Sequence, residues 1–127
     1  MRQHTILVVE DDERQRRLVC DLLKVKGYEV LIAENGTSGI DVAVQQQPDL
    51  ILLDIRLPDI SGLEVAGVLK TTPNTRAIPI VAVTAHAMPG DEQIIREKGC
   101  DAYMAKPIDI HQLLKLVTNL LCGPRYS

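Results

Sequence analysis

The chain has 127 residues, of which 46% are hydrophobic and 24% are charged, a composition typical of one globular domain with a single core. Its formal net charge of −3 at pH 7 gives no general attraction to nucleic acid or to anionic lipid. Phe and Trp are absent, so aliphatic side chains must build the core and few aromatic rings remain for base stacking.

Short aliphatic runs alternate with stretches of helical periodicity along the chain. The runs predict five strands, and the middle ones are too continuous for strands with one exposed face. We therefore expect a sheet that is covered on both sides. In chain order the predicted strands are Ile6–Val9, Val30–Ala33, Leu50–Leu53, Ile80–Val83 and Ala102–Ala105.

Helical spacing occupies the segments between and after these runs. The first helix has an apolar stripe over Leu18–Leu23 and a stop signal at Gly27. The last has apolar residues at three- and four-residue steps over Ile110–Leu121, and Asp109 before it is a suitable N-cap. Three further helices are expected at Gly36–Gln46, Gly62–Thr71 and Pro89–Lys98.

Alternation of strands and helices implies parallel strands joined by right-handed crossovers, that is, an α/β fold. The chain shows no internal linker, low-complexity tract or repeat, so we expect one domain over residues 1–122 and a flexible C-terminal tail at 123–127. Ligands of such sheets bind beyond the carboxyl ends of the strands. The residues that follow the predicted strands there are Glu10–Asp12, Asp54, Thr84 and Lys106.

This edge of the sheet would collect several carboxylates. Two carboxylates ~4 Å apart repel by about 4 kcal/mol at an effective dielectric constant near 20, so a cluster needs a compensating cation or raised pKa values. Oxygen ligands of this kind suit Mg²⁺. Lys106 is an alternative source of positive charge that requires no metal. Asp12 has a simpler interpretation as the N-cap of the first helix.

Other site types are disfavoured by particular residues. Neither a G-x-x-x-x-G-K-[ST] loop nor a G-x-G-x-x-G turn after the first strand is present, and the glycines of "ENGTSG" are better explained as a turn and helix start. A phosphatase of the haloacid dehalogenase type has a second Asp two residues after its nucleophile, where this chain has Arg56. His4, His86 and His111 have no metal-ligand spacing and are interpreted as surface residues.

Four segments, in order along the chain, together resemble the receiver domain of two-component response regulators. They are "ILVVEDDE", "LILLDIRLPDISG", "VAVTAHA" and "YMAKP", and the resemblance covers about residues 5 to 121. It implies a flavodoxin-like, doubly wound, five-stranded parallel sheet of order 2-1-3-4-5 flanked by five helices.

The resemblance also assigns roles to the residues of this edge. Asp54 would accept a phosphoryl group from a phosphohistidine of a sensor kinase or phosphotransfer protein and form an acyl phosphate. Glu10, Asp11, Asp54 and the backbone carbonyl of Arg56 would hold Mg²⁺. The protein would then be a signalling switch, not a metabolic enzyme, with magnesium-dependent self-phosphorylation and self-dephosphorylation.

Further residues would bind the phosphoryl group or transmit the signal. Lys106 would pair with one phosphoryl oxygen, and Thr84 would donate its hydroxyl to another. Movement of Thr84 would let Tyr103 turn inward, although a partly buried Tyr with a solvated hydroxyl is an equal alternative. The face made by the fourth helix, the fifth strand and the fifth helix would bind a downstream protein. The structural residues of these motifs are Pro58, Gly62 and Pro107, the last after a cis peptide bond.

Two residues are expected to tune hydrolysis of the acyl phosphate. Arg56 and His86 lie two positions after Asp54 and Thr84, and would flank the approach of water. Arg56 offers only donors and would shield the phosphoryl group, whereas His86 would be able to act as a base.

Alternatives in other classes are a receiver-like binding module that takes no phosphate and a small metal-dependent phosphatase of similar fold; the four motifs favour the switch. We expect a single-domain regulator, with a fragment of a longer regulator as the second choice. Three cysteines without disulfide or metal spacing, and no signal-peptide or transmembrane run, predict a soluble cytoplasmic protein that contacts neither membrane nor nucleic acid.

Overall fold

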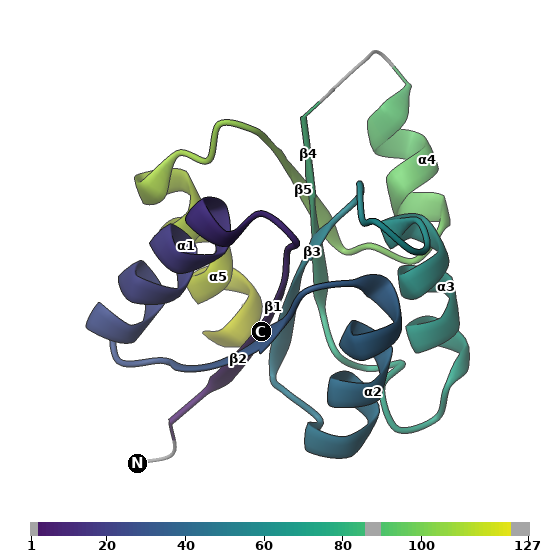
Figure 1. Cartoon of the computed structure of the whole chain (residues 1–127), viewed down its shortest axis with the longest axis horizontal. Coiled ribbons are helices and arrows are strands. Elements are labelled where there is room, and N and C mark those ends of the chain that lie inside the picture. The colour runs from purple at the N-terminus through teal and green to yellow at the C-terminus, as the bar shows by residue number, and fades with distance from the viewer. Residues whose placement is uncertain (1–2, 86–89, 123–127) are drawn as a thin grey trace.

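The computed structural model of the chain describes residues 3–85 and 90–122. Strands and helices alternate throughout this part of the chain (Figure 1). The elements are β1 (Thr5–Val9), α1 (Glu13–Val25), β2 (Glu29–Ala33), α2 (Gly36–Gln46), β3 (Leu50–Asp54), α3 (Gly62–Thr71), β4 (Ile80–Thr84), α4 (Asp91–Glu97), β5 (Ala102–Ala105) and α5 (Ile110–Cys122). None of the described helices is long and apolar enough to cross a membrane.

The five strands form one parallel sheet of order β2-β1-β3-β4-β5. Figure 1 shows the sheet in the middle of the molecule, with α1 and α5 on one face and α2, α3 and α4 on the other. This is the doubly wound α/β fold that the sequence predicts. All strands therefore present their carboxyl ends at the same edge of the sheet.

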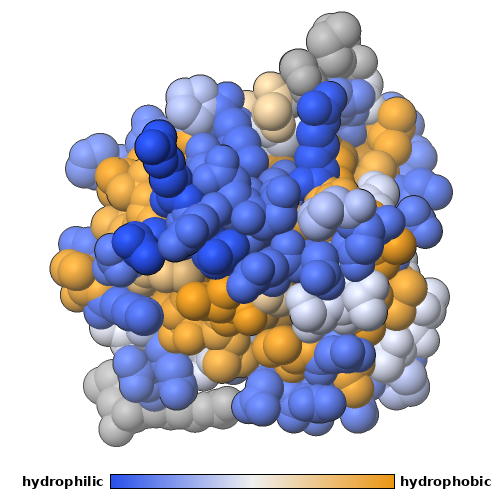
Figure 2. Space-filling view, in the orientation of Figure 1, coloured by the Kyte–Doolittle hydropathy of each residue, from blue (hydrophilic) through white to orange (hydrophobic). Residues whose placement is uncertain are grey.

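The core is aliphatic and lies in two layers, one on each face of the sheet. Successive strand residues point to opposite faces, so Leu7 and Val9 pack toward α2, α3 and α4, whereas Ile6 and Val8 pack toward α1 and α5. Every residue of β3 is buried, as expected for a central strand covered on both sides. In Figure 2, polar side chains cover the surface over the carboxyl edge of this sheet.

The structure corrects the predicted ends of several elements. Strands β1 and β2 each begin one residue earlier than predicted, at Thr5 and Glu29, and α5 ends one residue later, at Cys122. Strands β3 and β4 each include one residue more than predicted, because the ladder continues through Asp54, which is paired with Val83, and through Thr84, which is paired with Ala105. Helix α4 is shorter than predicted. Gly90, at φ 93°, is its N-cap and Lys98 its C-cap, while Pro89 lies outside the described residues.

The helix caps agree with the sequence. The Asp12 carboxylate accepts hydrogen bonds from the backbone N–H groups of Arg14 and Gln15, and so caps α1. Asp109 accepts from the Gln112 N–H at 3.1 Å at the start of α5. Asn35 caps α2, which begins at the first glycine of "ENGTSG".

Candidate functional site

Asp54 is the last residue of the central strand β3 and is only 4% exposed. Its Oδ1 accepts a hydrogen bond from the backbone N–H of Arg56 at 3.0 Å, and its Oδ2 lies 3.3 Å from the Lys106 Nζ. Directly after the strand, the Ile55 N–H donates a hydrogen bond to the Val83 carbonyl oxygen at 3.0 Å. The carboxylate is therefore mounted on rigid backbone and held at both oxygens.

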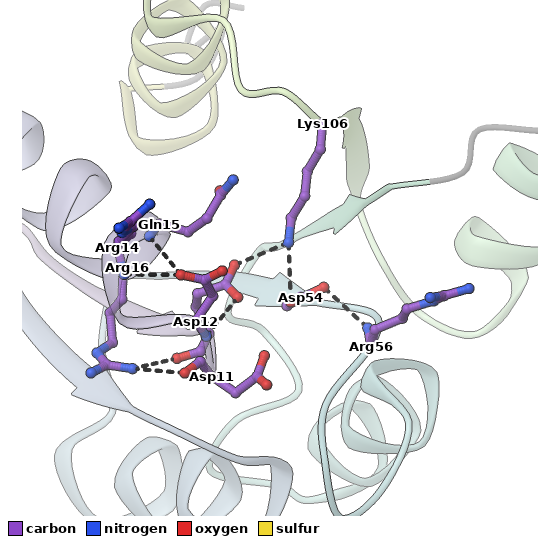
Figure 3. Close-up of polar contacts among 9 residues, drawn as sticks. Asp11, Asp12, Arg14, Gln15, Arg16, Asp54, Arg56 and Lys106 are labelled. Carbon is purple, nitrogen blue, oxygen red and sulfur yellow. Dashed lines mark hydrogen bonds and ion pairs between the residues drawn. The ribbon is translucent and has the colours of Figure 1, made fainter.

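Lys106 joins acids from two strands (Figure 3). It follows β5, and its Nζ lies 3.3 Å from the Glu10 Oε1 as well as 3.3 Å from the Asp54 Oδ2. Burial disfavours the charged amine, but attraction from Asp54 and Glu10 outweighs this effect and raises the pKa of Lys106. The amine is therefore a fixed positive charge within the acidic cluster.

Glu10 and Asp11 complete the cluster from the end of β1. Burial, together with a hydrogen bond to Asp54, raises the pKa of the Glu10 carboxyl from 4.5 to about 7. Asp11 is exposed, and each of the three acids offers an oxygen within 4.8 Å of the other two. Asp12, whose carboxylate caps α1, is not among them.

The donor set fits Mg²⁺. Oxygen ligands of one octahedral Mg²⁺ lie about 3 to 4 Å apart, because each is ~2.1 Å from the ion. The three carboxylates need only a small contraction to reach that spacing. Lys106 contacts two of the three acids, and the pKa of Glu10 is nevertheless raised, first by burial and then by its contact with Asp54.

The remaining predicted residues lie around this cluster. Thr84 is buried at the end of β4, where its carbonyl oxygen accepts from the Lys106 N–H at 2.8 Å. The Lys106–Pro107 peptide bond is cis, as the resemblance implies. Tyr103 on β5 is half-buried and packs against the core layer of the α2, α3 and α4 face. Pro58 is exposed in the loop after β3.

Of the two residues expected to tune hydrolysis, the structure describes Arg56 but not His86. Arg56 is exposed, and Figure 3 shows its side chain pointing away from the Asp54 carboxylate. His86 lies outside the described residues. Their roles stay predictions.

The sequence did not predict a role for Asp59, which connects the loop after β3 to the start of α2 by hydrogen bonds. Its carboxylate accepts from the Gly36 N–H at 2.7 Å, the Thr37 N–H at 2.9 Å and the Thr37 hydroxyl at 2.7 Å. The hydrogen bonds from Thr37 and the start of α2 lower the pKa of Asp59. An acid near a helix N-terminus is a known stabilising arrangement, but only the fold brings these distant segments together.

Comparison with known proteins gives consistent matches over nearly the whole chain. Residues 6–118 match the family described as response regulator receiver domain. The polar-differentiation response regulator DivK of Brucella anthropi is 44% identical over 117 residues, which are 92% of this chain and 95% of the relative.

Two solved structures illustrate the likeness in fold. The receiver domain of a sensor histidine kinase from Pseudomonas aeruginosa, which has a magnesium ion in its active-site cleft, has a TM-score of 0.88 at 30% identity and covers 96% of this chain and 100% of that chain. The receiver domain of a Saccharomyces cerevisiae response regulator was solved together with a histidine phosphotransfer protein. It has a TM-score of 0.88 at 25% identity, and the match covers 94% of this chain and 90% of that chain. With its sheet order and acidic cluster, the chain belongs to the response regulator receiver domain family.

Proposed function

We propose that this receiver domain is a phosphoacceptor switch in which Asp54 takes the phosphoryl group. The observation that carries the proposal is the place of Asp54, buried at the end of β3 with two further carboxylates and Lys106 around it. The donor would be a phosphohistidine of a histidine kinase or a phosphotransfer protein, the kind of partner present in the yeast complex. We place the protein in the cytoplasm.

The proposed reaction is a transfer between two nucleophiles. An Asp54 oxygen forms a bond to phosphorus while the bond from phosphorus to the histidine nitrogen breaks, and the imidazole keeps the electron pair. Lys106 offsets the charge of one phosphoryl oxygen, and the Thr84 hydroxyl donates to another. Mg²⁺, held by Glu10, Asp11, Asp54 and the Arg56 carbonyl, would supply further charge compensation.

We propose that the signal leaves through the face formed by α4, β5 and α5. Thr84 lines a cavity of about 220 Å³ together with Ile94 and Ile95 of α4, so movement of its side chain changes the packing of that helix. Tyr103 lies on the strand between α4 and α5 and is half-buried, which allows it to turn inward. A downstream protein would bind more tightly to one of the two arrangements.

The proposal is tested with acetyl phosphate as donor and intact-protein mass spectrometry as readout. With Mg²⁺ the wild type should gain one phosphoryl group, and Asp54→Asn should gain none. The matched control is Asp12→Asn, the same substitution on the same edge of the sheet, which keeps the α1 cap because Asn caps as well as Asp. Labelling of Asp54→Asn at the wild-type rate would refute the assignment, as would equal loss in Asp12→Asn.

A further inference from the structure

Arg16 of α1 makes hydrogen bonds with the main chain of Glu10 and Asp11, which are called the acidic pair below. The Arg16 Nη1 donates to the Glu10 carbonyl oxygen at 2.9 Å and, less closely, to the Asp11 carbonyl oxygen at 3.4 Å (Figure 3). One guanidinium thus contacts both residues whose carboxylates converge with Asp54.

Arg16 and Lys106 neutralise the cluster in different ways. Lys106 lies against carboxylate oxygens of Glu10 and Asp54, which are the atoms that a metal ion would use. Arg16 binds carbonyl oxygens instead, so it adds positive charge and leaves those carboxylate oxygens accessible. Its guanidinium also stays charged at every pH at which the protein folds.

The base of this contact is rigid. Arg16 lies in the first turns of α1, where its own N–H donates to the Asp12 carbonyl at 2.9 Å. The helix is anchored on the sheet by the buried side chains of Val19, Cys20 and Leu23. A side chain that projects from a packed helix holds its target more closely than one on a loop.

We propose that Arg16 is a positioning residue for the metal site. It fixes the backbone of Glu10 and Asp11 so that their carboxylates stay turned toward Asp54 against their mutual repulsion. The inference rests on the proposed magnesium-dependent function, but Arg16 itself is not a ligand of the ion.

The test compares Arg16→Gln with Arg17→Gln by calorimetric titration with MgCl₂. Arg17 is the next residue of the same helix, is 72% exposed and pairs with Glu13 at 3.2 Å. Both variants remove one positive charge from α1, so a general charge effect would appear in both. We expect Arg16→Gln to weaken Mg²⁺ binding about tenfold, or ~1.4 kcal/mol, and Arg17→Gln by less than about twofold.

Two further readouts separate positioning from charge and from folding. The loss in Arg16→Gln should persist at ~0.5 M salt, where exposed charges more than about 5 Å apart are screened. With acetyl phosphate, the Mg²⁺ concentration for half-maximal phosphorylation should rise about tenfold, while the rate at saturating Mg²⁺ stays near the wild-type value. Urea unfolding without Mg²⁺ reports whether each variant is folded.

The outcomes are distinguishable. Wild-type Mg²⁺ affinity in Arg16→Gln, equal losses in the two variants, or a loss that disappears at high salt would overturn the inference. If Arg16→Gln does not fold, Arg16→Lys replaces it, and its point charge should restore binding only to within about threefold of wild type; full affinity would overturn the inference. Expected Mg²⁺ results with no phosphoryl group on Asp54 would refute the proposed function and leave Arg16 as a metal-positioning residue.

Discussion

Gly62 offers the sharpest test of how closely the fold is built around Asp54. It is the first residue of α3 and donates its N–H to the Ile55 carbonyl at 2.9 Å. A Cβ added at Gly62 would lie against the Asp54 carbonyl oxygen, 2.7 Å from the Ile55 Cα and 3.0 Å from the Asp54 carbonyl carbon, where ordinary contacts begin at 3.4 Å. In Gly62→Ala, either the end of β3 or the start of α3 must therefore move.

The cost follows from what surrounds the new methyl group. Overpacking costs ~1–3 kcal/mol, and the upper end applies because backbone atoms cannot rotate away. Replacing Gly by Ala in a helix returns ~0.5–1 kcal/mol. We expect Gly62→Ala to lose about 2 kcal/mol of unfolding free energy. Gly67→Ala, five residues on in the same helix, meets no heavy atom within 4 Å and should be stabilised by ~0.5–1 kcal/mol.

Urea denaturation followed by far-ultraviolet circular dichroism measures both variants. With a slope of ~1–3 kcal/mol per molar urea, a loss of 2 kcal/mol moves the midpoint down by about 1 M. Phosphorylation of folded Gly62→Ala should also be slow, because misplacement of a reacting group by ~1 Å can cost about 100-fold in rate. A midpoint at or above the wild-type value in Gly62→Ala would refute the steric reasoning.

Four further predictions concern the acidic cluster and the lifetime of the acyl phosphate. Asp11→Ala should weaken Mg²⁺ binding far more than Asp12→Ala does. Asp12→Ala should instead lose ~1 kcal/mol of unfolding free energy, because it removes the α1 cap. Equal losses of Mg²⁺ affinity in the two variants would mean that the acidic pair is wrongly assigned. Calorimetric Mg²⁺ affinity should fall as the pH drops through about 7, because protonated Glu10 is a poor ligand, and Glu10→Gln should abolish this dependence. Without Mg²⁺ the unfolding free energy should decrease as the pH rises from 4.5 to about 7, since the folded state holds the Glu10 proton more tightly than the unfolded state; urea midpoints that rise over this range would contradict it. Arg56→Asn should lose its phosphoryl group several-fold faster after donor removal if the exposed arginine swings over the site as a shield, and unchanged decay would show that it does not.

The sequence predicts the strands well because burial on both faces leaves a continuous aliphatic run. It misplaces the ends of β3 and β4 because the hydrophobic pattern stops at Asp54 and Thr84, while the backbone ladder continues through them. The ladder depends on main-chain atoms, and a polar side chain at a strand end does not interrupt it.

The sequence likewise predicts some parts of the candidate site and not others. The four motifs predict which acids and which lysine meet at the carboxyl edge, because that meeting follows from parallel strands. The contacts of Arg16 and Asp59 were not predicted, because most of their partners are backbone carbonyls and N–H groups, which nearly every residue carries. Main-chain contacts of this kind leave no signature in the order of side chains.

The position of Lys106 has a consequence for the order of events at Asp54. Its amine lies against Oε1 of Glu10 and Oδ2 of Asp54, so a divalent ion that used these two oxygens would have to replace an internal cation. Such a replacement would free the amine only once other positive charge had entered, and in the proposed reaction a freed amine would pair with a phosphoryl oxygen. If Asp54 takes a phosphoryl group as proposed, Lys106 would stay paired with the two acids until a metal ion and a phosphoryl group were both present.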